Sequence, residues 1–164
     1  MARAKKTKNA MTGEFILRIF VAAVLGGAIG LEREYRIKAA GLRTHFLVAL
    51  GSALFMIVSA YGFEHAITLP EHRLDVSRIA AQVVTGIGFI GAGTIIFQKN
   101  VVHGLTTAAG IGVTAAIGLT CGAGMFVLAT AATVRVLLGL AAFGFFLHWL
   151  ERRRNAADAA GEEA

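Results

Sequence analysis

Charged residues are almost absent from the middle of this chain, and this absence constrains the fold more than any other feature. The chain holds 16 basic and 10 acidic residues, yet only Lys99 and Arg135 lie within residues 79–150. Uncharged runs cover residues 44–63, 79–98 and 100–134. A helix needs roughly 20 apolar residues to cross a hydrocarbon core about 30 Å thick. The pattern therefore predicts an integral membrane protein.

Several classes of protein are excluded by the rest of the composition. A single cysteine, Cys121, excludes a disulfide framework and a cysteine-built metal centre. The net charge of +6 lies at the edges of the apolar runs, so it does not indicate a nucleic-acid partner. The histidines lack the H-E-x-x-H spacing, and no nucleophile stands beside a base. We therefore expect no metal site, no cofactor and no enzymatic activity.

The apolar pattern predicts an all-α, polytopic bundle of about five membrane helices. Continuous apolar runs favour helices, because barrel strands would alternate between two faces. The glycine-rich stretch 86–93 leaves open that the third helix is broken or re-entrant. A basic tail at residues 1–13 and a polar tail at residues 151–164 are expected to flank the membrane domain, residues 14–150. The expected helices are 14–31, 42–62, 76–97, 104–120 and 125–149.

The predicted topology places the two ends of the chain on opposite sides of the membrane. With five crossings, six basic residues lie on the N-terminal side and eight on the other side. The positive-inside rule then favours a cytoplasmic C-terminus by a small margin. Arg135 lies within the last helix, where it either extends to the nearer interface or pairs inside the bundle.

A polar stripe enters the third predicted helix. Asp75 and Arg78 are three residues apart and share a helix face, and Gln82 lies one turn further on. These residues are either a helix cap beside an interfacial arginine or the start of a solute path. An amide inside a bilayer needs a partner, which favours the functional interpretation.

Two further groups of polar residues are candidates for a binding cluster. Glu32 and Arg43 flank the first predicted turn, beside several other charged residues and His45. They form either an ion or anion site or a surface belt of charge. Thr106, at the start of the fourth helix, either caps amides or lines a polar cavity.

Glycines form a second pattern. The run Gly86-Ile-Gly88-Phe-Ile-Gly91 matches the dinucleotide fingerprint G-x-G-x-x-G, but no acidic residue follows before Leu150, so we interpret it as helix packing. Small residues allow the close backbone approach that helices need in lipid. The helix faces that carry these small residues either pack inside the bundle, or form a dimer interface, or belong to a bent helix that lines a solute path. The predicted packing glycines are Gly26, Gly30, Gly86, Gly88, Gly91 and Gly93.

Taken together, these motifs resemble the MgtC/SapB family of bacterial inner-membrane proteins. The resemblance is carried by GGAIGLERE at residues 26–34, GLRTH at 41–45 and DVSRIAAQVVTGIGFIGAG at 75–93. GLTTAA at 104–109 and the later AAIG and GAG segments follow in order. After residues 104–109, Gly110-Ile-Gly112 stands where the family usually has an aromatic residue, which loosens the fourth helix.

The resemblance implies a small polytopic protein with a regulatory role. Some members support growth at low magnesium or survival inside macrophages. They act through other inner-membrane proteins, including the proton-translocating ATP synthase, rather than by carrying magnesium. Longer members add a cytoplasmic C-terminal domain, which favours a cytoplasmic C-terminus here and a short, SapB-like form.

Carried over by motif, the functional residues are Glu32, Arg43, Asp75, Arg78, Gln82 and Thr106. The expected partners are the lipid bilayer, a second copy in a homodimer, and other membrane proteins. The alternative is a small dimeric channel or transporter whose path starts at Asp75, Arg78 and Gln82.

Overall fold

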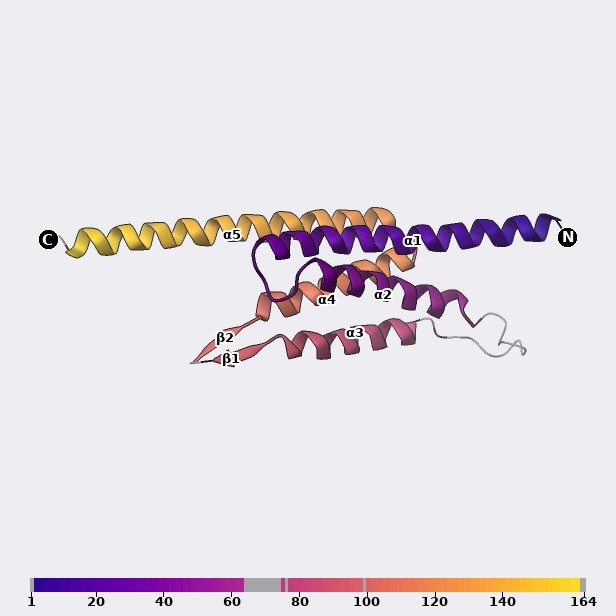
Figure 1. Ribbon diagram of the computed structural model, residues 1–164, viewed down its shortest axis with the longest axis horizontal. Coiled ribbons are helices and arrows are strands. Elements are labelled where there is room, and N and C mark those ends of the chain that lie inside the picture. The colour runs from indigo at the N-terminus through magenta and orange to yellow at the C-terminus, as the bar shows by residue number, and fades with distance from the viewer. Residues whose placement is uncertain (1, 64–74, 76, 99, 163–164) are drawn as a thin grey trace. The chain divides into compact units, whose positions relative to one another are not determined.

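The computed structural model of the chain describes residues 2–63, 75, 77–98 and 100–162. Its described residues form five helices and one two-stranded hairpin (Figure 1), which confirms the all-α prediction. The elements are α1 (Ala2–Tyr35), α2 (Leu42–Tyr61), α3 (Ser77–Gly93), β1 (Ile96–Gln98), β2 (Val101–His103), α4 (Leu105–Gly122) and α5 (Phe126–Glu162).

Two compact units divide the chain, residues 1–133 and 134–164. The second unit consists of the later part of α5. Within it, the rings of Phe146 and Trp149 stack with centroids 6.2 Å apart, and the guanidinium of Arg153 lies 4.4 Å from the Trp149 ring centre. An aromatic pair followed by arginines is typical of a helix segment that leaves the bilayer.

Four helical segments are long and apolar enough to cross a membrane. They are Met11–Tyr35, Leu42–Tyr61, Leu105–Gly122 and Phe126–Phe146. The remaining helix, α3, has 17 residues, or about 26 Å at 1.5 Å per residue, slightly less than the hydrocarbon core. It is continuous through the glycine-rich stretch and ends at Gly93.

The observed helices extend beyond the expected bounds at both ends of the chain. α1 begins at Ala2, within the segment expected to be a tail, and α5 continues to Glu162 rather than ending near residue 149. Alanine, lysine and arginine make up most of the first extension, and alanine, arginine and glutamate most of the second. These residues have high helix propensity, so a helix that has started in the apolar segment continues through them.

The connection between α3 and α4 also differs from the expected short turn. β1 and β2 pair antiparallel, with Ile96 opposite His103, and Asn100 in the turn has a φ of 63°. The expected helix end at residue 97 is therefore wrong, because the β-branched residues after Gly93 enter a strand. Gly104 follows the hairpin with a φ of 89°, and a Cβ atom there would overlap the carbonyl of Thr94.

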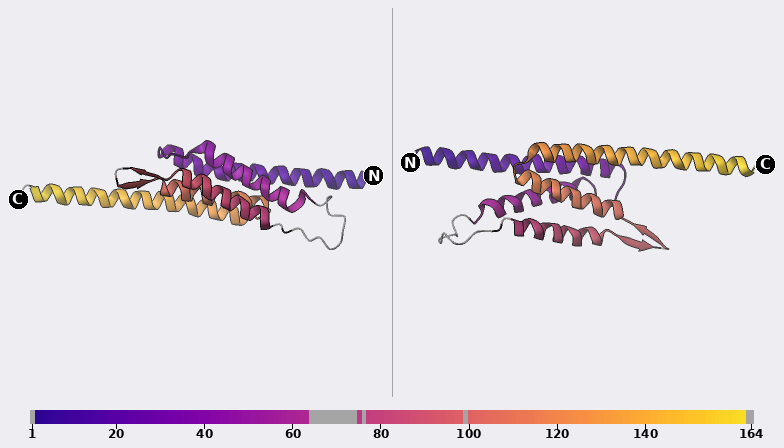
Figure 2. Two further views of the ribbon diagram at one scale, coloured as in Figure 1. Left: turned by 90° about the horizontal axis from the view of Figure 1, so that it is seen from below. Right: turned by 180° about the vertical axis from the view of Figure 1, so that it is seen from behind.

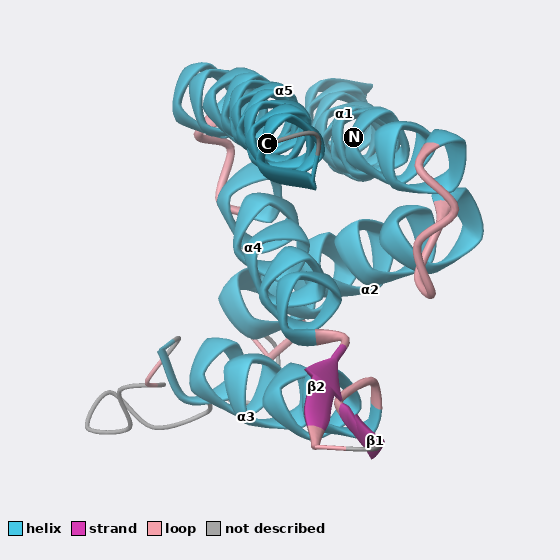
Figure 3. Cartoon of the chain, turned by 90° about the vertical axis from the view of Figure 1, so that its left-hand side faces the viewer, coloured by secondary structure: helices cyan, strands magenta, loops and turns pink. Residues whose placement is uncertain are grey.

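Within the first unit, α2 and α4 lie between α1 and α3, as the end-on view in Figure 3 shows. Consecutive helices from α1 to α4 run in opposite directions, which the views in Figures 1 and 2 agree on. The α1–α2 corner and the start of α4 therefore lie at one end of this unit, and the start of α3 lies at the other.

Glycines bring α2 into backbone contact with both of its main neighbours. A Cβ atom at Gly26 of α1 would lie 2.7 Å from the carbonyl oxygen of His45, and one at Gly30 would lie 2.7 Å from the Cα of Leu42. On the other side of α2, a Cβ atom added at Gly122 of α4 would lie 2.6 Å from the carbonyl oxygen of Ala53. Lipid supplies no hydrophobic force between helices, so these close contacts hold the bundle together.

Adjacent glycines of α1 offer a matched test of this packing. We expect Gly26→Ala to lower the free energy of unfolding by about 1–3 kcal/mol, because the added methyl group has no room against α2. Gly27→Ala should cost nothing, since its nearest neighbour, Leu42 Cδ1, would lie 3.7 Å away and alanine favours the helix. Titration with dodecyl sulfate in mixed micelles, followed by circular dichroism, measures both, and equal stabilities would contradict the packing role of Gly26.

Candidate functional site

The sequence-predicted polar residues lie at opposite ends of the first unit. Glu32 is near the end of α1 and Arg43 near the start of α2, whereas Asp75 and Arg78 are at the start of α3. Because α2 and α3 run in opposite directions, the chain by itself does not bring these pairs together. Thr106 is exposed at the start of α4, at the same end as Glu32.

Asp75 caps α3. Its carboxylate accepts a hydrogen bond of 2.6 Å from the Ser77 hydroxyl and one of 3.0 Å from the Ser77 backbone N–H. These two donors hold the pKa of Asp75 below its usual value. Among the ion pairs of the described residues, none joins Asp75 to Arg78, and both side chains are exposed. The start of the polar stripe is thus a helix cap with an exposed arginine beside it.

The charged residues of the α1–α2 corner are largely paired with one another. The Glu32 carboxylate forms two ion pairs. Its Oε1 lies 2.5 Å from Arg36 Nε, and its Oε2 lies 3.2 Å from Arg33 Nε. Glu34 accepts a hydrogen bond of 2.8 Å from the backbone N–H of Leu42 and so caps α2. These contacts fix the connection between α1 and α2, and they do not form an open ion site.

His45 lies directly behind this corner and is fully buried. Its Nδ1 is 2.9 Å from the carbonyl oxygen of Gly41, and its Nε2 has no hydrogen-bond partner among the described residues. The Nε2 atom faces α4, since a Cβ at Gly110 would lie 3.5 Å from it. The ring therefore packs against α4 at Gly110 with room for a Cβ atom between them.

Arg18 is the most important polar residue that the sequence analysis missed. It is only 7% exposed, although it lies inside the first apolar segment. Its Nη1 donates a hydrogen bond of 2.8 Å to the carbonyl oxygen of Gly122, the last residue of α4, and its Nη2 pairs with Glu14. Nη1 also lies 3.4 Å from the Tyr61 hydroxyl at the end of α2. A helix C-terminus has unpaired carbonyls and partial negative charge, so a cation is favourable there.

A signal for Arg18 was present in the sequence. It is a lone basic residue within an apolar run, four residues after Glu14, and this spacing predicts an intrahelical pair. The carbonyl partner in α4, however, is more than one hundred residues away. No local pattern identifies such a partner.

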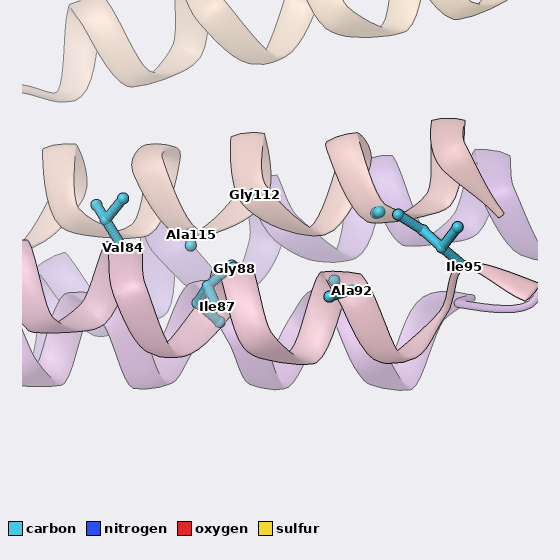
Figure 4. Close-up of a pocket in the computed structure, with 9 residues that line it drawn as sticks. Val84, Ile87, Gly88, Ala92, Ile95, Gly112 and Ala115 are labelled. Carbon is cyan, nitrogen blue, oxygen red and sulfur yellow. The ribbon is translucent and has the colours of Figure 1, made fainter.

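α3 is bordered by two apolar grooves. The groove between α3 and α4 has a volume of about 370 Å³ and includes Gly88 and Ala92 of α3 and Gly112 and Ala115 of α4 (Figure 4). Val84, Ile87 and Ile95 are its larger side chains. The groove between α2 and α3 has a volume of about 470 Å³ and includes Gln82 and Ser52 among apolar residues. Both grooves fit an apolar chain better than a charged ligand.

The predicted packing glycines separate into two groups in the structure. Gly26 and Gly30 lie directly against α2, and Gly91 is in ordinary contact with Ala108 of α4. The others, Gly86, Gly88 and Gly93, would each place a Cβ in open space. Three of the four glycines of α3 therefore form an open surface rather than a filled seam.

These features define the class of the protein. It is a polytopic helical membrane protein whose helices are joined by glycine contacts, and whose third helix borders apolar grooves. The MgtC family model matches residues 19–149, and the chain belongs to that family.

Two relatives show how far the similarity extends. The chain is 58% identical over 133 residues to the Escherichia coli K12 protein named "Putative magnesium transporter YhiD", covering 81% of this chain and 62% of that protein. It is 46% identical over 123 residues to "Protein MgtC" of Salmonella typhimurium LT2, covering 75% of this chain and 49% of the relative. The chain thus spans about half to three fifths of the length of these relatives. No solved structure matches it.

Removal of the Arg18 guanidinium is expected to destabilise the bundle. Arg18→Met leaves the Gly122 carbonyl without its donor, which should lower the free energy of unfolding by about 1–3 kcal/mol. Arg135→Met is the control, since Arg135 is exposed. Dodecyl sulfate titration measures both variants, and an Arg18→Met protein as stable as the control would show that the contact contributes nothing.

Protonation of Asp75 should weaken the start of α3. A carboxylate whose pKa is lowered on folding stabilises the fold above its unfolded pKa, and this contribution is lost as pH falls through the lower, folded value. We expect Ser77→Ala to raise the Asp75 pKa towards its usual value, whereas Ser77→Thr, which keeps the hydroxyl, should raise it less. Carbon-13 NMR titration of the Asp75 carboxyl group measures the shift, and identical pKa values in all three proteins would refute the cap.

Proposed function

We propose that this chain is a non-enzymatic protein of the bacterial inner membrane that supports growth at low magnesium by contacting other membrane proteins. The observation that carries the proposal is the α3–α4 groove, which is apolar and open. Family membership supports the link to magnesium, because the E. coli relative is named for magnesium transport.

The groove suits an apolar transmembrane helix of a partner protein. Gly88 and Gly112 have open space where a Cβ would project, so a neighbouring backbone can approach closely from both sides of the groove. Val84 and Ile95 extend beside this small-residue surface and provide side-chain contacts. A charged solute would find few partners there, since the lining is almost entirely aliphatic.

The polar groups inside the bundle also favour regulation over transport. Arg18 is occupied by the Gly122 carbonyl and Glu14. The hydroxyls of Thr114 and Thr133 each donate 2.9 Å hydrogen bonds to carbonyl oxygens one turn earlier in their own helices. These groups already have partners among the described residues, so they are not available to line a solute path.

Transport by a dimer is the second candidate function. The observation that favours it is the exposure of Asp75, Arg78 and Gln82 at the start of α3, where two copies could surround a polar path. In that case the relevant path would run between subunits rather than through one of them.

The proposed orientation places the C-terminus in the cytoplasm. Trp149 and the exposed Arg152 and Arg153 follow the apolar part of α5, which is the pattern of an aromatic anchor beside cytoplasmic positive charge. Fusion of a reporter that is active only in the cytoplasm to the C-terminus would test this orientation.

Filling the α3–α4 groove should abolish function without unfolding the protein. We expect a strain without the gene to grow poorly at low magnesium and to be rescued by the wild-type chain but not by Gly88→Leu, whose side chain would occupy the groove. Gly13→Leu is the matched control, because it also has open space but lies outside the groove. Growth rate and the amount of chain in the membrane fraction are measured together.

Three results would contradict the proposal. The first is rescue by Gly88→Leu equal to that by the wild-type chain, and the second is normal growth of the strain without the gene. The third is magnesium uptake by vesicles containing the purified chain, above that of protein-free vesicles and abolished by Gln82→Leu, which would establish the transporter instead.

A further inference from the structure

The face of α3 that lies away from α4 carries a continuous exposed stripe. Its members are Arg78, Gln82, Gly86, Phe89 and Gly93, all exposed and spaced by four or three residues. At 100° per residue they fall within about 80° of the helix circumference. Asp75, the helix cap, directly precedes them. This spacing is that of the contact seam between two paired helices.

The stripe has one large projecting side chain, Phe89, between two glycines that leave open space. Phe89 is 84% exposed, so nearly the whole ring projects from the bundle. Gly86 and Gly93, on either side of it, have open space where a side chain would lie. Gly86 also borders the α2–α3 groove together with Gly51, which is open as well. A protruding ring thus stands beside a depression large enough to receive one.

The polar members of the stripe are complementary to themselves. The Gln82 amide has no hydrogen bond to any described residue, and in lipid an amide without a partner is costly. An amide is both donor and acceptor, so two copies related by a two-fold axis can satisfy each other. Asp75 and Arg78 have opposite charges and form no ion pair with each other or with another described residue, so each can face the other type in the second copy.

We propose that two copies of this chain pair through α3, with Gln82 facing Gln82 and each Phe89 ring entering the other copy's α2–α3 groove. This interface is isologous, because both copies use the same surface of α3 and the adjoining groove. It lies on the side of α3 opposite the α3–α4 groove. The homodimer therefore does not depend on the proposed partner-binding role.

Two glycines of α3 provide a matched pair for the test. Gly86 lies on the stripe and Gly88 lies in the α3–α4 groove, and both have open space around them, so leucine at either position is compatible with the folded chain. The experiment measures energy transfer between donor- and acceptor-labelled full-length chains in phospholipid vesicles over a range of protein-to-lipid ratios. We expect Gly86→Leu to weaken dimerisation at least tenfold and Gly88→Leu to remain within about twofold of wild type.

The amide contact has its own variants. Gln82→Leu should weaken the dimer about three- to tenfold, whereas Gln82→Asn, which keeps an amide, should weaken it less. A wild-type chain that is monomeric at every ratio would overturn the proposal. So would a dimer that Gly86→Leu leaves intact or that Gly88→Leu disrupts equally.

Cross-linking in native membranes tests the orientation of α3 directly. In a Cys121→Ala background, Gly93→Cys should form an intermolecular disulfide with a mild oxidant, and Ala92→Cys, the adjacent exposed position in the α3–α4 groove, should not. Equal cross-linking at both positions, or none at Gly93→Cys, would contradict the interface. The Gly88→Leu variant separates the two proposals. Loss of growth at low magnesium together with an intact dimer would support partner binding at the α3–α4 groove and leave dimerisation through α3 unaffected.

Discussion

The structure depends on the close approach of helix backbones at glycine. Lipid chains are as apolar as leucine side chains, so burying leucine between helices gains little, and short contact distances must provide the attraction. α2 has such contacts on two sides, with Gly26 and Gly30 of α1 and with Gly118 and Gly122 of α4. The small residues Ala49 and Ala53, both fully buried, complete these seams from α2.

The same constraint explains why charged groups can lie inside the bundle. Helices that approach closely bring the carbonyl end of one helix within reach of side chains on another, and Arg18 uses this at Gly122. The ring of His45 lies against α4 at Gly110, where a Cβ atom would be in ordinary contact with Nε2. Polar residues and glycines are therefore parts of one packing scheme, in which Gly122 brings α4 close to α2 and its carbonyl oxygen accepts the hydrogen bond from Arg18 of α1.

Local features of the sequence predicted the helices, because apolar length and charge placement act within a single segment. They also identified Asp75 at the start of α3, since capping involves residues only two positions apart. The hairpin after Gly93 is also local, but the apolar pattern predicts the end of a helix at its β-branched residues. The partner of Arg18 and the separation of Glu32 from Asp75, in contrast, depend on contacts between distant segments or on helix direction. No spacing rule within one helix contains that information.

α3 shows what the glycine-rich composition means beyond packing. If all its glycines served internal contacts, each would lack space for a side chain, as Gly26 does. Only Gly91 lies against a neighbour, and Gly86, Gly88 and Gly93 face open space on two different sides of the helix. Glycine lowers helix stability by about 1 kcal/mol relative to alanine, and within the described chain these three gain no contact that offsets this cost. We therefore place both the dimer contact and the partner groove on this helix, at the surfaces that the described residues of the first unit leave open.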